Sequence, residues 1–313
     1  MMSGALAVVA QMALMLFLSP LITGFSRTFK ARLQTRRGPD IFQPYRNLHK
    51  LLRKGMVIPE TASWIFAATP YVLFVTTLLA GLLIPAVSTQ APLTLFGGAL
   101  AVVYLLALGR FFLALGGLDA GSPFGGLGSS REMTIAAIAE PALMLAVFTV
   151  AIGAGSTNLS VVAQAGLGQS WRFLAPPQML AFAALFIVLI AETGRIPVDN
   201  PTTHLELTMI HEAMILEYSG PYLALIEWSA AMKQLVLMTL LVNVFFPFGL
   251  SDGWASTDAL RSLFLFSAKL LLLAAAVALV ETTNAKMRLF RVPELLTVAF
   301  VLSAMALIST FLF

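Results

Sequence analysis

The fold of this chain is decided by stretches such as SLFLFSAKLLLLAAAVALVE (residues 262–281), in which Lys269 and Glu281 are the only charged residues. A helix of this length is about 30 Å long, which equals the thickness of the hydrocarbon core of a membrane. The stretch therefore predicts a membrane-spanning helix.

Similar stretches occur along the whole chain. Of its 313 residues, 59% are hydrophobic and only 11% are charged, and the mean hydropathy is +0.89. A soluble domain carries about 25% charged residues, so a soluble enzyme is excluded. No linker or internal repeat divides the sequence, and we predict one all-α polytopic membrane domain over residues 1–313. Its eight spans are predicted at residues 3–25, 64–86, 94–115, 133–153, 178–194, 222–247, 262–281 and 293–312.

The basic residues are distributed very unevenly between the two sides of this topology. Nine of the 19 Lys and Arg residues lie between Arg27 and Lys54, next to the first span. If that segment is cytoplasmic, 14 basic residues lie on the cytoplasmic side and two, Arg172 and Arg261, lie opposite. Cytoplasmic loops of membrane proteins are enriched in Lys and Arg. We therefore expect a cytoplasmic (inner) membrane protein with both termini on the non-cytoplasmic side. The basic segment would face anionic lipid headgroups or acidic partner proteins, and not nucleic acid.

The chain has no cysteine and three histidines, His49, His204 and His211. Disulfides, cysteine-bound iron–sulfur clusters and cysteine-based zinc sites are thereby excluded. His204 and His211 are seven residues apart, about 10.5 Å along a helix, which is too far for both to bind one ion. We expect neither a metal nor a cofactor in this chain, so that any electrons travel in other subunits.

Several ionisable residues fall inside or at the ends of the predicted spans. An ionised group at the bilayer centre costs about 2.5–3.5 kcal/mol on insertion scales, so such residues should face the bundle interior. Arg110 is near a span end and could extend its guanidinium to the interface. Carboxylates that alternate with amines can form either a proton relay or ion pairs that fix helix packing, and both interpretations stay open. The carboxylates and amines in question are Glu140, Glu192, Glu227, Lys233, Lys269 and Glu281.

Two predicted cytoplasmic loops carry distinctive patterns. The loop between the fifth and sixth spans is acidic, and a short amphipathic helix is predicted to begin at Thr203, with Glu206 completing a capping box. The other loop, GGLDAGSPFGGLGSSRE (116–132), is glycine-rich and lacks a phosphate-binding pattern. We interpret it as a flexible docking loop, followed by a span that Ser129 caps.

Two motifs resemble a known family. RLQTRRGPDIFQPYRNLHKLL (32–52) and the series ETGRIPVDNP (192–201), LEL (205–207) and EYSG (217–220) resemble subunit 1 of respiratory complex I and its relatives in group 4 nickel–iron hydrogenases. The number of spans is that of this eight-helix family. Within this family, the sequences of these motifs look most similar to those of the membrane subunits of hydrogenase-4 and formate hydrogenlyase complexes. Thr202 and His204 stand where the quinone-reducing branch has acidic residues, which argues against a quinone pocket.

The resemblance implies a membrane anchor and energy-coupling subunit that catalyses nothing alone. It docks the hydrogenase large and small subunits and iron–sulfur subunits, which would hold the nickel–iron centre and the clusters. It would link them to proton or Na⁺ translocation by antiporter-like membrane subunits. The alternatives are a quinone-binding subunit of a complex I-type dehydrogenase and a passive scaffold. The resemblance adds Asp199, Glu206 and Glu217 to the proton path, and the docking loops include Arg36, Arg37, Asp119 and Arg195.

Overall fold

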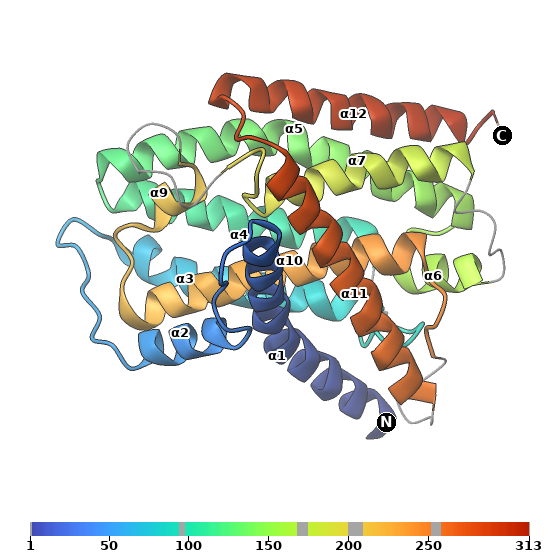
Figure 1. Ribbon diagram of the computed structural model, residues 1–313, viewed down its shortest axis with the longest axis horizontal. Coiled ribbons are helices and arrows are strands. Elements are labelled where there is room, and N and C mark those ends of the chain that lie inside the picture. Colours follow the sequence, from blue (N-terminus) through green and yellow to red (C-terminus); the bar gives the residue numbers. More distant parts are fainter. Residues whose placement is uncertain (1, 94–97, 168–174, 200–208, 252–257, 313) are drawn as a thin grey trace.

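The computed structural model describes residues 2–93, 98–167, 175–199, 209–251 and 258–312, and these ranges consist almost entirely of helices (Figure 1). Seven helical segments are long and apolar enough to cross a membrane, and α7 is a shorter apolar helix. The prediction of an all-α protein with about eight spans is confirmed. In chain order the helices are α1 (Met2–Leu33), α2 (Gln43–Leu52), α3 (Trp64–Leu83), α4 (Ala99–Asp119), α5 (Pro123–Ala154), α6 (Leu159–Leu167), α7 (Pro176–Glu192), α9 (His211–Ile215), α10 (Gly220–Phe245), α11 (Asp258–Thr283), η3 (Leu289–Arg291) and α12 (Val292–Ser309).

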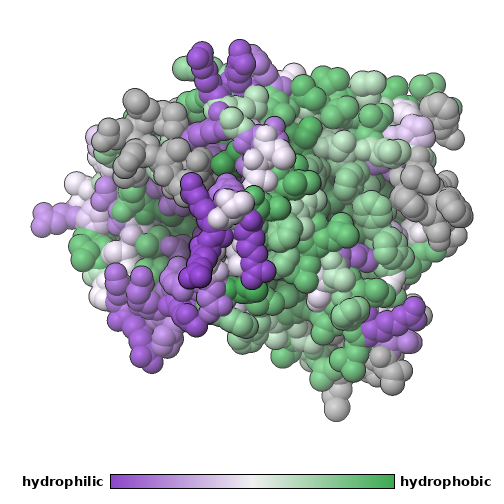
Figure 2. Space-filling view, in the orientation of Figure 1, coloured by the Kyte–Doolittle hydropathy of each residue, from purple (hydrophilic) through white to green (hydrophobic). Residues whose placement is uncertain are grey.

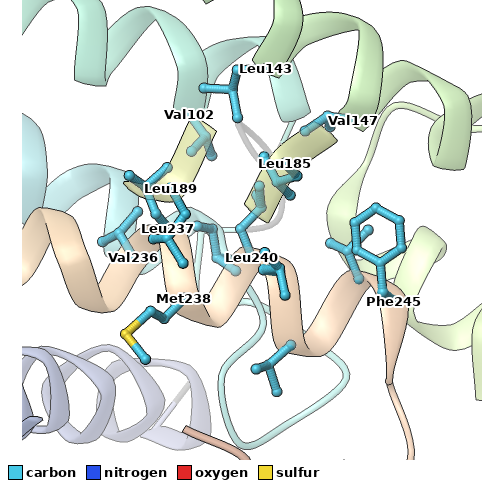
Figure 3. Close-up of a cluster of buried hydrophobic side chains, with 14 of the residues drawn as sticks. Val102, Leu143, Val147, Leu185, Leu189, Val236, Leu237, Met238, Leu240 and Phe245 are labelled. Atoms are coloured by element: carbon cyan, nitrogen blue, oxygen red, sulfur yellow. The ribbon is translucent and has the colours of Figure 1, made fainter. Parts of the chain in front are cut away.

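Helix α10 lies at the centre of the bundle, where it contacts α1, α2, α3, α7 and α11. Its residues from Gln234 to Phe245 are all buried. Figure 3 shows Leu237 and Leu240 of α10 beside Leu185 and Leu189 of α7, with side chains of α4 and α5 completing the cluster. This apolar centre fixes the helices that carry the charged residues described below.

The two ends of the bundle differ in character. The N- and C-terminal ends marked in Figure 1 both lie on its right-hand side, away from α2 and α9. Figure 2 shows hydrophilic side chains gathered mainly at the opposite end, where α2 and α9 lie, and apolar side chains over most of the remaining surface. Apolar side chains of the outer helices are widely exposed, Phe264 by 73% and Leu272 by 75%. We call the hydrophilic end the polar end; that it is cytoplasmic stays a prediction.

The basic segment after α1 contains a helix that is absent from the predicted spans. In α2, Pro44, Leu48 and Leu51 are buried, and the two leucines contact Ala224 of α10. Arg46 on the same helix is 66% exposed and pairs with Asp40 at 2.9 Å. The apolar residues of α2 recur at helical spacing, and this period is the signal in the sequence that could have revealed the helix.

The glycine-rich segment 116–132 is not a flexible loop. Helix α4 continues to Asp119 and α5 begins at Pro123, so that only three residues connect them. The glycines instead allow close packing, because a Cβ atom on Gly125 would lie 2.1 Å from the carbonyl oxygen of Gly117. Ser129 is not a cap either, since it lies inside α5 and its hydroxyl donates to the carbonyl of Ala114 at 2.9 Å. Both predictions were wrong because a glycine-rich helix and a glycine-rich loop have the same composition.

The predicted amphipathic helix in the acidic loop would begin at Thr203, which lies outside the described residues, as do Thr202, His204 and Glu206. The described part of that loop contains the short helix α9, whose Ala213, Met214 and Ile215 are buried.

The close approach of α4 and α5 can be tested with adjacent glycines. Gly125→Ala should lower the thermal midpoint and the folded yield, because its new Cβ meets backbone that must move, a cost of about 1–3 kcal/mol. The matched control is Gly126→Ala, where the nearest atom to a new Cβ is Leu118 Cδ2 at 4.0 Å. That variant should be neutral or slightly more stable, since alanine is favoured over glycine in helices by about 1 kcal/mol. Equal stability of the two variants would contradict the assigned packing.

Candidate functional site: a buried ionic network

A buried arginine joins three carboxylates from two neighbouring helices. Arg110 of α4 is 5% exposed, and its guanidinium contacts Glu132 and Glu140 of α5 and Glu192 of α7. The Nε atom lies 3.4 Å from Glu132 Oε1, and Nη1 lies 2.9 Å from Glu140 Oε1. Nη2 donates to Glu192 Oε2. The idea that Arg110 extends to the interface was wrong, because the neighbouring carboxylates compensate its charge inside the bundle.

Lys233 of α10 completes this set, with its Nζ atom 2.7 Å from Glu192 Oε2. We call Arg110, Glu132, Glu140, Glu192 and Lys233 the Arg110 cluster. Two cations face three carboxylates, so the fully ionised cluster has a net charge of −1. One proton would neutralise it. Glu192 is 3% exposed whereas Glu140 is 33% exposed, which makes Glu140 the more accessible carboxylate of these two.

A cavity connects the cluster to the loop that follows α7. Its empty volume is about 770 Å³, including space that is open to the outside. Arg110, Glu132, Glu192 and Lys233 line it from the cluster, and Asp199 lines it from the loop. The rest of its wall is largely apolar, and water molecules beside the charged groups could bridge them.

The loop over residues 193–199, which we call the α7 loop, is held by a second set of ion pairs. Glu281 at the end of α11 is 4% exposed and accepts from Arg195 and from Lys30 of α1, both at 2.7 Å. Arg195 also donates to the side-chain oxygen of Gln234 at 2.7 Å, the residue after Lys233. Asp199 pairs with Lys286 at 3.0 Å and accepts from the backbone N–H of Ile210 at 3.1 Å. The loop is thus tied to α10 and α11 next to the cluster, and Lys30 joins α1 to the same carboxylate of α11.

The structure divides the predicted proton path into separate groups. Glu140, Glu192 and Lys233 belong to the Arg110 cluster, and Asp199 and Glu281 hold the α7 loop. Glu217 and Glu227 are exposed. Lys269 lies apart from all of these, since its Nζ donates to the carbonyl of Phe246 just beyond the far end of α10.

The predicted docking residues differ in their surroundings. Arg36 and Arg37 are exposed in the segment between α1 and α2. Arg195 is occupied by the contacts given above. Asp119 caps α3, because its carboxylate accepts from the backbone N–H groups of Ser63 at 2.7 Å and Phe66 at 3.1 Å. A carboxylate at a helix N-terminus is stabilised by the helix dipole.

Sequence reasoning missed Glu132, Lys30, Lys286 and Gln234 as members of the two networks. The span that Ser129 was predicted to cap begins at residue 133, ten residues after the start of α5, so the prediction left Glu132 outside the helix. The sequence did contain a signal for the earlier start of α5. Pro123 suits the first turn of a helix, and no further proline interrupts residues 124–132, so Glu132 lies inside the helix. Lys30 and Lys286 carried no signal, since both lie in basic stretches outside the predicted spans.

The EYSG motif has a structural explanation. The ring of Tyr218 stacks on Phe66 of α3 with ring centroids 4.0 Å apart, and its hydroxyl donates to the carbonyl of Phe66 at 3.2 Å. Burial raises the pKa of the Tyr218 hydroxyl, so that it stays protonated and remains a donor. A Cβ on Gly116 would lie 2.3 Å from the Tyr218 hydroxyl oxygen. Tyr218 therefore joins the start of α10 to α3 and α4.

In the described ranges no group of three or more His, Cys, Asp or Glu side chains is arranged to hold a metal ion. The ionisable side chains of the network are instead paired with each other. The arrangement can hold or move protons, and it can transmit a displacement of the α7 loop to Glu192.

The chain is thus a helical membrane bundle. Its buried cations and carboxylates pair with each other near the polar end, which suits an integral membrane protein that couples the movement of charges. A model of the NADH dehydrogenase family matches residues 5–312, and the chain belongs to this family, that of complex I subunit 1.

Relatives from two branches match most of the chain. It is 37% identical to hydrogenase-4 component C of Escherichia coli (strain K12), over 95% of this chain and 93% of the relative. It is 35% identical to formate hydrogenlyase subunit 4 of the same organism, over 95% of this chain and 96% of the relative. Identity to an NADH-quinone oxidoreductase subunit of Caulobacter vibrioides is 28%, over 79% of this chain and 73% of that relative.

The same fold occurs in a solved complex, the membrane-bound sulfane sulfur reductase, described as an archaeal respiratory membrane complex. One of its chains superposes with a TM-score of 0.86 at 21% identity, covering 98% of this chain and 99% of that chain.

Replacement of Arg110 tests whether the cluster holds the helices together. Arg110→Met leaves three carboxylates facing Lys233 alone, and removal of one partner from a buried ionic set costs about 3–5 kcal/mol. The folded yield and thermal midpoint in detergent should fall sharply. Arg110→Lys should have an intermediate effect, because one ammonium cannot replace the guanidinium fork. Arg53→Met, at an exposed arginine, is the control and should behave as the unmodified protein. An unchanged midpoint in Arg110→Met would contradict this role.

Proposed function

We propose that this chain is the membrane anchor and energy-coupling subunit of a group 4 membrane-bound nickel–iron hydrogenase or formate hydrogenlyase complex. The observation that carries the choice of branch is the 37% and 35% identity to the two E. coli relatives over 95% of this chain, against 28% over 79% for the quinone oxidoreductase relative. The chain supplies no redox centre in this proposal. The nickel–iron centre and the iron–sulfur clusters belong to partner subunits, which dock at the polar end.

The polar end has the chemistry expected of a docking surface. Arg36 and Arg37 extend from it, and Val57 and Ile58 are 73% and 45% exposed between α2 and α3. Segment 56–58 is held in place, because Ser219 Oγ accepts from the Val57 N–H at 2.9 Å and donates to its carbonyl at 3.0 Å. Basic and apolar groups on a fixed backbone suit a lasting contact with acidic partner subunits.

Coupling would operate through the α7 loop. Glu192 is the last residue of α7, and Arg195 is three residues further along the chain. A displacement of the loop by docked subunits would separate Arg195 from Glu281 or Asp199 from Lys286, and would shift Glu192 against Arg110 and Lys233. Because the cluster has one carboxylate more than its cations, such a shift changes its affinity for a proton. Glu140 is the group that would exchange this proton with antiporter-like subunits.

The quinone-binding alternative has less support. The relatives that represent it are less similar to this chain and match less of it. Thr202 and His204, which replace loop carboxylates of that branch, lie outside the described residues, so the argument from them stays a sequence argument.

Purification of the native complex tests the assignment. A tag on this chain should recover nickel–iron hydrogenase large and small subunits, iron–sulfur subunits and antiporter-like membrane subunits, identified by mass spectrometry. The same tagged complex should contain nickel. Recovery of an NADH-oxidising module with quinone reductase activity would instead select the alternative, and recovery of no redox subunit would contradict the proposal.

Glu140→Gln distinguishes coupling from scaffolding. The change removes the titratable proton and keeps the shape of the side chain. If Glu140 exchanges protons, complex yield and hydrogenase activity should persist while ΔpH formation in vesicles is lost. Lys233→Met should uncouple in the same way if its amine takes part in the relay. Glu294→Gln, at an exposed carboxylate of α12, is the matched control and should pump normally.

Other outcomes of this experiment reject the relay. Normal yield with normal ΔpH in Glu140→Gln would remove Glu140 from the proton path. Low yield with ΔpH reduced in proportion would assign the Arg110 cluster to packing alone.

A further inference from the structure

Lys269 is a cation in a spanning helix with an unusual environment. Its Nζ atom donates to the carbonyl of Phe246 at 2.7 Å and lies 4.5 Å from the centre of the Phe248 ring. Among the described residues no carboxylate lies within 4 Å of it. Among the described residues its charge is offset by partial charges, those of a carbonyl beyond the C-terminus of α10 and of an aromatic face.

Lys233 shows what an ammonium in this bundle otherwise receives, since it meets the carboxylate of Glu192 at 2.7 Å. An ammonium group has three N–H donors, and Lys269 uses one of them on Phe246. The remaining donors and the positive charge can therefore accept an anion, which none of the described residues supplies within 4 Å.

An apolar groove adjoins this lysine at the end of the bundle that carries the termini. It lies between α5, α6, α7 and the segment that follows α10, with an empty volume of about 880 Å³ that includes space open to the outside. Gln178 is the one polar side chain among the described residues that line it. Phe246 and Phe248 both line the groove and contact Lys269, so the cation lies beside one wall of it.

We propose that Lys269 and this groove bind an anionic phospholipid, whose phosphate pairs with the ammonium while an acyl chain occupies the groove. A lysine near the end of a helix bundle extends its charge to the headgroup level, and basic sites between membrane helices bind anionic headgroups. A carboxylate from a neighbouring subunit would satisfy the charge but would leave the apolar groove unexplained. The proposal does not depend on the hydrogenase assignment.

The test uses the purified complex, washed with detergent and titrated with phosphatidylglycerol or with zwitterionic phosphatidylethanolamine. The retained lipid is counted by native mass spectrometry, and the thermal midpoint is followed. The unmodified protein should retain phosphatidylglycerol selectively, with a higher midpoint. Lys269→Met should weaken its retention at least tenfold and abolish the selectivity.

Two further variants keep the test decisive if Lys269→Met folds poorly. Gly153→Leu should also weaken retention at least tenfold, because Gly153 lines the groove and a new Cβ there meets nothing within 4 Å. Arg261→Gln, at an exposed arginine nearer the start of α11, should retain lipid as the unmodified protein does. Equal loss in Arg261→Gln would indicate diffuse surface charge and overturn the site. Unchanged lipid retention in Lys269→Met, with loss of a neighbouring membrane subunit, would assign the lysine to a protein interface and equally overturn it.

Discussion

Most of the polar architecture of this protein depends on one guanidinium. Arg110 is 5% exposed in the interior of a helix bundle, and an ionised group in that position is stable only when opposite charges surround it. Glu132, Glu140 and Glu192 supply these charges from two further helices. Lys233, on a fourth helix, pairs with Glu192 and offsets part of the negative charge. Each helix must therefore keep its register, since a slip of one residue would turn a charged side chain toward apolar neighbours. The network is thus a constraint on packing as well as a candidate site for protons.

The same arrangement explains why coupling and scaffolding are difficult to separate by inspection. A buried ionic set fixes helices when every charge is compensated, and it responds to protons when one carboxylate is in excess. The Arg110 cluster has both properties, and its Glu192 leads directly into a loop that Glu281 and Asp199 hold by further ion pairs. The functional proposal rests on this continuity between a loop at the polar end and carboxylates inside the bundle. Lys269 and the apolar groove lie toward the opposite end of the bundle.

Small residues make the polar contacts possible. Helices α4 and α5 approach so closely at Gly117 and Gly125 that a single methyl group would meet backbone oxygen. Membrane helices gain little from the hydrophobic effect when they associate in lipid, so close backbone packing and polar contacts carry more of the association. Here the glycine contacts lie on the same pair of helices that brings Arg110 to Glu132 and Glu140. Composition alone suggested a loop at this point, whereas the packing partner shows why the glycines are needed.

The sequence by itself determined the class of protein, the spans and the family. Long apolar stretches fold as helices in a bilayer, and the motifs around Arg36 and Glu192 resemble the family whose model matches residues 5–312. It also identified Glu140, Glu192, Lys233 and Glu281 as costly charges that need partners. Only the tertiary structure decided who those partners are, because Arg110, Glu192 and Lys233 lie far apart in the chain and meet through helix packing. For the same reason the sequence could not separate Lys269 from the cluster or place Lys30 and Lys286 in the second network. A charge in a helix shows in the sequence that it needs compensation, but the compensating group is chosen by the neighbour that the fold places beside it.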